Sequence, residues 1–101
     1  MGTDELKITF NGFNCIVVLS QYQSTIQNSL ELIDETDGLP VAVASVNIPG
    51  EYQAPDEVFI KSWSENTGLC KELMEQEIIG PVIEYITVGY AKASRRQILI
   101  I

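Results

Sequence analysis

One short stretch, residues 61–68 with the sequence KSWSENTG, gathers the side chains most suited to chemistry. Trp63 is followed by a hydroxyl, a carboxylate and an amide on Ser64, Glu65 and Asn66. A helix is expected just beyond them, and the first N–H groups of a helix lack partners within it. Ser64 or Asn66 can cap those groups, and Glu65 is favoured near the positive end of the helix dipole. We interpret the stretch as a helix start, with Trp63 as a partner-binding anchor if its side chain is exposed.

An acidic turn, residues 34–38 with the sequence DETDG, is the second candidate site. A calcium loop of the EF-hand type does not fit, because Gly38 would place Ile33 at the first ligand position and Ala44 where the closing Glu belongs. A solvated turn is the simplest interpretation, with a loose cation site or contact with a partner as alternatives. The acidic residues of this candidate interaction site are Glu31, Asp34, Glu35 and Asp37.

Chemistry that depends on imidazole or on paired thiols has no residues to support it in this chain. There is no histidine, which removes the commonest general base and the usual catalytic triads. The two cysteines, Cys15 and Cys70, lack the spacing of zinc ligands, and no glycine-rich phosphate loop occurs. We therefore predict no catalytic residue, no metal and no cofactor. An enzyme that uses carboxylates alone is the competing hypothesis.

The cysteines and the apolar runs also bear on the compartment. Each cysteine lies among apolar neighbours, as expected of a small core side chain. Two cysteines do not make a disulfide framework, so a reduced, intracellular setting is predicted. No segment approaches about 18 consecutive apolar residues, and no signal peptide is recognisable at the start. The expected location is cytoplasmic, without a membrane partner.

Charge is distributed unevenly along the 101 residues, whose formal net charge is −8. Residues 1–60 carry nine acids and one base, whereas residues 61–101 carry five acids and five bases. A negative surface repels phosphate groups, so direct binding to nucleic acid or to an anionic membrane is disfavoured. The acidity either serves recognition of a partner or keeps a strand-rich domain in solution.

The hydrophobic period changes once along the chain. The first half alternates in steps of two, and Asn11-Gly12 separates two such runs, which predicts a β-hairpin. Beyond residue 68 the apolar residues recur at steps of three and four, which predicts one amphipathic helix ended by Gly80-Pro81. The apolar stripe of this helix consists of Leu69, Cys70, Leu73, Met74 and Ile78.

These patterns predict an α+β fold in two layers. A largely antiparallel sheet, which begins as an N-terminal β-meander, is covered on one face by the single amphipathic helix. The chain forms one domain, because 101 residues leave no room for a second core. The expected elements are strands over about 5–10, 13–22, 26–33, 41–48 and 58–60, a helix over about 66–78, and strands over about 82–88 and 94–100.

The only basic pair, Arg95 and Arg96, falls in the last expected strand. Neighbours on a strand face opposite sides, so the two side chains are not expected to form one patch. Charges on an edge strand that discourage unwanted pairing are the simpler interpretation. Addition of this strand to a partner or to a second copy is the alternative.

Several landmarks together resemble a small family of bacterial, phage and conjugative-element proteins known only as a domain of unknown function. The family pattern reads VNxxG, then IKxxSENEG, then SGF. The matching residues are Val46-Asn47, Gly50, Ile60-Lys61, Ser64-Glu65-Asn66, Gly68 and Gly89-Tyr90. Thr67 stands where the family has Glu, and the C-terminal tail differs. The resemblance implies a compact cytoplasmic domain carried on mobile elements, and it supplies no activity or site residue.

The leading hypothesis is a non-enzymatic accessory factor of a phage or mobile element that acts by binding another protein. In a sharper version, the acidic half imitates nucleic acid and inhibits a host protein with a basic groove. Trp63 and the acidic turn are the candidate contacts. The partner is unidentified, and the chain is expected to be a monomer or a homodimer.

Overall fold

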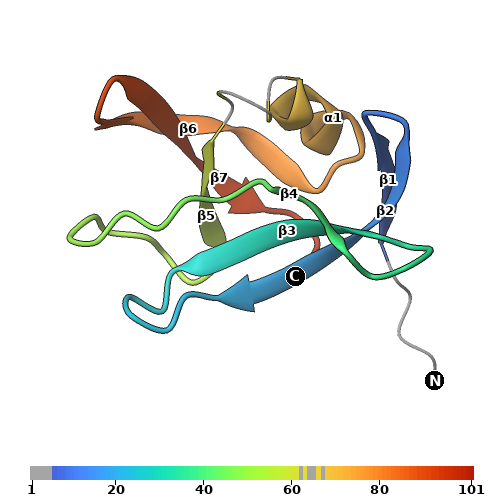
Figure 1. The fold of residues 1–101 in the computed structure, drawn as a ribbon. Helices are drawn as coiled ribbons and strands as arrows, with labels where there is room; N and C mark the ends of the chain where they lie inside the picture. The colour runs from blue at the N-terminus through green and yellow to red at the C-terminus, as the bar shows by residue number, and fades with distance from the viewer. Residues whose placement is uncertain (1–5, 62, 64–65, 67) are drawn as a thin grey trace.

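Five strands precede one helix and two strands follow it in this computed structural model, which describes residues 6–61, 63, 66 and 68–101 (Figure 1). The elements are β1 (Lys7–Phe10), β2 (Phe13–Gln21), β3 (Asn28–Asp34), β4 (Pro40–Val43), β5 (Glu57–Lys61), α1 (Leu69–Glu75), β6 (Ile79–Val88) and β7 (Ala91–Ile98). All paired strands are antiparallel. The α+β class expected from the period change is therefore confirmed.

The first four strands form a meander in the order β1-β2-β3-β4. The β1–β2 turn has positive φ at both Asn11 (52°) and Gly12 (82°), as a type I′ turn requires. Phe10 then pairs with Phe13, and the predicted hairpin is confirmed. The fourth strand is shorter than expected because it ends at Val43, before the chain crosses to the second sheet.

The last three strands form a second sheet in the order β5-β7-β6. A bridge between Ser45 and Ile60, with Lys61 N–H donating to the Ala44 carbonyl at 2.9 Å, joins the end of the meander to β5. The sequence does not foresee this division, because alternation within a strand says nothing about which neighbour it pairs with. The two sheets enclose one apolar core between them (Figure 1).

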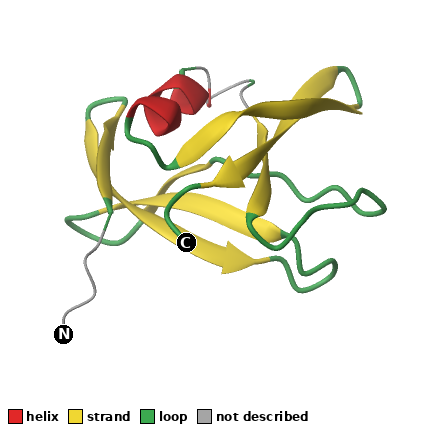
Figure 2. Cartoon of the chain, turned by 180° about the vertical axis from the view of Figure 1, so that it is seen from behind, coloured by secondary structure: helices red, strands yellow, loops and turns green. Residues whose placement is uncertain are grey.

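Helix α1 lies over the gap between β1 and the start of β6 (Figure 2). Leu69 and Leu73 are fully buried in the core, which confirms the predicted apolar ridge. Burial of such side chains stabilises the fold by about 1.5–3 kcal/mol each. Met74 was expected on the same stripe, but it is 39% exposed because it lies one position beyond the buried face.

Both ends of the helix differ from expectation. Its N-cap is Gly68, in the left-handed region at φ 86°, and no side-chain hydrogen bond from the described residues caps the first turn. The helix stops at Glu75, where Glu77 turns the chain with φ 58°, so Gly80-Pro81 does not end it. Those two residues lie inside β6, where the proline is tolerated because β6 is an edge strand and its register with β7 is irregular between Ile79 and Val82. Over the described residues, no helix has the length and apolarity needed to cross a membrane.

The last strand, β7, lies in the middle of its sheet, between β5 and β6. The prediction that its charges protect a sheet edge is therefore wrong, and this strand has no free edge to offer a partner. The separation of its two arginines is confirmed. Arg95 lies on the outer face, where it contacts Glu57 at 2.9 Å and Glu84 at 3.2 Å. Arg96 is buried and donates to the Gly80 carbonyl at 3.0 Å.

Candidate functional site

The KSWSENTG stretch is only partly within the described residues, since Ser64, Glu65 and Thr67 lie outside them. Trp63 is half-buried, so it is not a freely exposed anchor. Asn66 is fully buried and does not cap α1. Its Nδ2 donates to the Val43 carbonyl at 2.7 Å, which ties the end of β4 to the segment before the helix. The described residues of this stretch therefore have a structural role that differs from the predicted cap.

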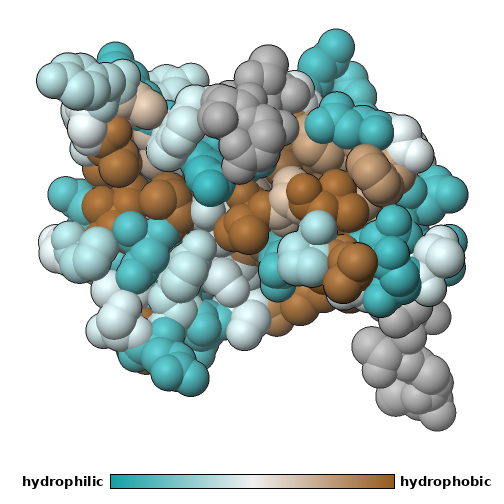
Figure 3. All heavy atoms as spheres, in the orientation of Figure 1, coloured by the Kyte–Doolittle hydropathy of each residue, from teal (hydrophilic) through white to brown (hydrophobic). Residues whose placement is uncertain are grey.

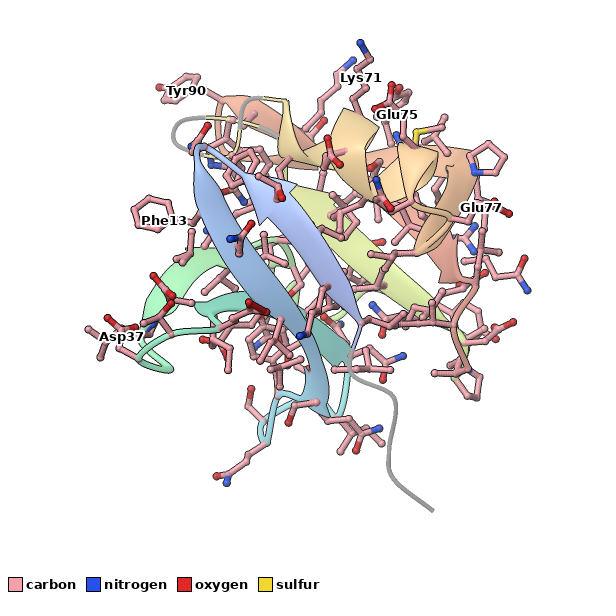
Figure 4. All side chains as sticks on the ribbon, turned by 90° about the vertical axis from the view of Figure 1, so that its right-hand side faces the viewer. Phe13, Asp37, Lys71, Glu75, Glu77 and Tyr90 are labelled. Atoms are coloured by element: carbon pink, nitrogen blue, oxygen red, sulfur yellow. The ribbon has the colours of Figure 1, made fainter. Side chains whose placement is uncertain are left out.

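The acidic turn between β3 and β4 uses its carboxylates to hold its own backbone. Asp34 accepts from Thr36 N–H at 2.8 Å, and Asp37 accepts from Leu39 N–H at 2.9 Å. Asp37 lies at the tip of this turn, away from the body of the molecule (Figure 4).

The other two acids of the candidate set lie apart from each other. Glu35 pairs with Lys7 at 3.1 Å, and Glu31 is half-buried on β3. Among the described residues, no group of three or more metal-ligating side chains converges here or elsewhere.

A cleft that the sequence reading did not anticipate lies between two connections, the β2–β3 turn and the segment that precedes β5. These connections run side by side at the lower left of the molecule (Figure 1). The cleft has a volume of about 480 Å³. It is lined by Gln21, Thr25, Ile26, Gln27, Asn28, Gly50, Glu51, Tyr52, Gln53, Ala54 and Pro55. A shallower hollow of about 640 Å³ continues along the other side of Ile26 and Asn28.

Two buried amides hold the walls of the cleft together. The Gln27 amide donates to the Ile48 carbonyl at 2.7 Å and accepts from Ile48 N–H at 2.9 Å. The Asn28 amide donates to the carbonyls of Pro55 and Glu57, at 2.9 and 2.7 Å. Both amide side chains are more than nine-tenths buried. Because side chains replace regular strand pairing here, the cleft is a fixed feature of the fold rather than a gap between loose loops.

One donor in the cleft wall lacks an acceptor. Gln53 accepts from Asn28 N–H at 2.7 Å through its Oε1, which fixes the orientation of the amide. Its Nε2 is buried and has no hydrogen-bond partner among the described residues. A buried polar group left unpaired costs about 1–3 kcal/mol, so a rotation of Gln53 that brought Nε2 to an acceptor in the cleft would be favoured.

The rim of the cleft carries two exposed apolar side chains. Ile26 is 72% exposed and adopts φ 56°, a left-handed conformation that β-branched residues avoid. Such strain costs on the order of 1–3 kcal/mol and is characteristic of functional positions. Tyr52 is 74% exposed on the opposite connection. The sequence contained one signal for this site, the glutamine-rich QYQSTIQN, but nothing in it identified the second wall.

The thiols lie away from the cleft and have little reactivity. Cys15 is fully buried, and burial, reinforced by the nearby charge of Asp34, raises the pKa of its thiol. Cys70 is half-buried, and burial likewise raises the pKa of its thiol. Both are free, and both pack in or against the core, as predicted. A raised pKa keeps a thiol protonated, so neither residue is an activated nucleophile.

On the face shown in Figure 3, apolar side chains reach the surface in separate patches divided by hydrophilic ones. No single apolar area on that face marks a binding site, so the cleft is the best-defined candidate. Comparison of the chain with family models, with curated proteins and with solved structures finds no match. The resemblance described above stays a prediction.

Proposed function

We propose that this protein is a non-enzymatic interaction domain, and that the cleft receives an extended segment of another protein. The observation that carries the proposal is the unpaired Gln53 Nε2 in the wall of a concave site. When the Gln53 side chain turns toward the cleft, a peptide carbonyl supplies the missing acceptor, and burial in the cleft strengthens that hydrogen bond. Ile26 and Tyr52 add apolar contact area on either side of the polar floor, which is the usual arrangement of a binding site.

Charge supports a basic segment as the ligand. The residues that line the cleft lie within the first sixty residues, which carry nine acids and one base. One of these acids, Glu51, is part of the lining. A negative field attracts positively charged segments and speeds their encounter. The titratable groups of the lining are Glu51 and Tyr52, which is consistent with recognition rather than with paired acid–base chemistry.

A random peptide library displayed on phage tests the proposal directly. We expect the wild-type protein to enrich peptides that contain Lys or Arg beside an apolar residue. Tyr52→Ala should raise the dissociation constant of a selected peptide at least about tenfold, because an aromatic side chain at the rim contributes more than about 1.4 kcal/mol to binding. Gln53→Glu keeps the acceptor and the shape of the side chain but removes the donor, and it should weaken binding similarly.

A matched control is Tyr90→Ala, since Tyr90 is an exposed tyrosine at the tip of the β6–β7 hairpin (Figure 4) and does not line the cleft. This variant should bind the peptide as the wild type does. Circular dichroism establishes that each variant is folded. Equal binding by Tyr52→Ala, Gln53→Glu and Tyr90→Ala would place the peptide site elsewhere and would overturn the proposal.

The alternative in which the acidic half imitates nucleic acid has less support. Such a surface needs a continuous array of carboxylates. The β3–β4 turn and the cleft lie at opposite ends of the molecule (Figure 1). Glu35 and Glu57 are also neutralised by ion pairs within the chain. A role in a phage or mobile element, and a cytoplasmic location, stay predictions that rest on the resemblance and on the composition.

A further inference from the structure

Strand β6 presents a long free edge. It spans ten residues, Ile79–Val88, and pairs on one side only, with β7. Two irregularities in register precede Glu84, after which the pairing is regular up to Val88. The strand then turns at Gly89 (φ 61°) into β7, as a two-residue hairpin allows. Residues 84–88 therefore form a straight edge whose outward backbone groups have no partner among the described residues.

Pro81 and both irregularities, which protect an edge, lie before Glu84, so the edge from Glu84 to Val88 keeps few of the features that prevent pairing. Residues 82–88, with the sequence VIEYITV, are nearly all β-branched or aromatic and include no lysine or proline. Ile83 is 49% and Tyr85 is 62% exposed. Its one charge, on Glu84, is held by Arg95 of the same chain at 3.2 Å. Free edges of this composition associate with other strands unless they are covered.

The other edges of the two sheets are protected. β1 and β4 are only four residues long, and β1 carries the exposed Lys7. The outer side of β5 is already bonded to the segment around Ser45. A strand that adds to this protein thus finds one long partner, β6.

We propose that β6 pairs antiparallel with β6 of a second copy of this chain, which makes one six-stranded sheet from two three-stranded ones. The balanced charge of the region around this edge favours a second copy of the chain over a strongly charged partner. Residues 61–101, which contain this edge, carry five acids and five bases, so the two halves in contact add no net repulsion of their own to that between the acidic halves. A second copy is also present wherever the chain is, and symmetric homodimers are the commonest assemblies.

A two-fold axis at Ile86 gives a self-complementary pairing. It sets Glu84 opposite Val88 of the other copy and Tyr85 opposite Thr87, so no like charges lie directly opposite each other. Pairing removes the long edge from both chains and leaves only the four-residue ones. The assembly therefore closes at two copies instead of growing into a fibre.

Sedimentation velocity over a range of protein concentrations tests the proposal. The wild type should sediment with twice the chain mass of 11.2 kDa at high micromolar concentration. A double variant, Ile83→Lys with Tyr85→Lys, places charges on the edge and should raise the dissociation constant by more than about tenfold. Leu39→Lys changes an equally exposed apolar residue on the β3–β4 connection, and it should leave the dimer intact.

Hydrogen exchange of the wild type supplies a second readout that needs no variant. Amides of residues 84–88 should exchange more slowly as the concentration rises, whereas those of β1 should not change. A wild type that stays monomeric at every concentration overturns the proposal. A dimer that Leu39→Lys dissociates as readily as the double variant, or whose protection maps to β1 or to the cleft, overturns it as well.

Discussion

The cleft and the β6 edge are two surfaces of one small molecule, and they are built in opposite ways. The walls of the cleft are joined by side-chain amides, mainly Gln27 and Asn28, where no strand pairing exists. The edge is held in place by regular backbone pairing of residues 84–88 with β7, and its side chains contribute little to that. Substitution of a single residue should therefore disturb the geometry of the cleft, whereas it should hardly change the geometry of the edge.

The largest expected effect comes from Asn28→Ala. It leaves the carbonyls of Pro55 and Glu57 without their donor, and we expect a loss of about 2 kcal/mol in the free energy of unfolding. Thr87→Ala, on the exposed side of β6, should change it by less than about 0.5 kcal/mol. Urea unfolding measures both, and equal losses would break the contrast between the two surfaces.

Ile26→Asn should change stability and binding in opposite directions. Asn tolerates a positive φ better than a β-branched residue does, so relief of strain should add about 1 kcal/mol to the free energy of unfolding. Loss of the exposed apolar side chain should weaken the binding of the peptide selected for the cleft. Leu39→Asn is the control, since Leu39 is similarly exposed without a positive φ. A less stable Ile26→Asn variant would mean that the left-handed residue is not strained.

Salt should separate the two surfaces. Binding of a basic peptide at the acidic cleft should weaken several-fold between low and high ionic strength, because screening removes long-range attraction. Dimer formation through the neutral edge should weaken much less, or even strengthen as the overall repulsion between chains of charge −8 is screened. Titration calorimetry and sedimentation at the same salt concentrations provide the comparison. A dimer that dissociates in salt as strongly as the peptide does would contradict it.

The smallest effect is a loss of stability in alkali. The pKa values of Cys15 and Cys70 are raised above 9.0 in the folded protein, mainly by burial. The unfolded chain therefore releases thiol protons first, and the free energy of unfolding should fall as the pH rises above about 9. The thiol contribution is complete below that pH. A Cys15→Ala, Cys70→Ala double variant should lose less stability over the same range, and an identical alkaline slope would exclude the thiols as its cause.

Much of the fold follows from the local pattern of residues. Asn11-Gly12 between two alternating runs is enough to predict the β1–β2 hairpin, since few residues other than Asn and Gly accept both positive φ values. The steps of three and four from Leu69 to Leu73 likewise predict the buried face of α1. Local signals were less reliable at element ends. Asn66 is a predicted cap, yet it is buried and Gly68 occupies the N-cap, and Gly80-Pro81 is a predicted stop but lies in β6.

The candidate sites show more clearly what local sequence patterns cannot predict. Trp63 and the acidic turn are candidates from the sequence because polar, charged or aromatic residues stand together there. The cleft cannot be predicted from local patterns, because its walls are distant in the chain: Asn28 N–H donates to Oε1 of Gln53, which lies 25 residues further along. The edge position of β6 escaped notice for a related reason, since strand order depends on long-range pairing.

The sequence by itself determined the antiparallel class, the amphipathic helix, the packing of both thiols in or against the core, and the concentration of negative charge in the first sixty residues. Each of these depends on residue type and on spacing within a few positions. Within the part of the chain that the structure describes, tertiary structure alone decided that β7 lies inside its sheet, that β6 is left with a free edge, and that Gln53 holds a donor without an acceptor. Those outcomes depend on which distant segments meet, because a polar group is paired or unpaired only relative to its neighbours in space.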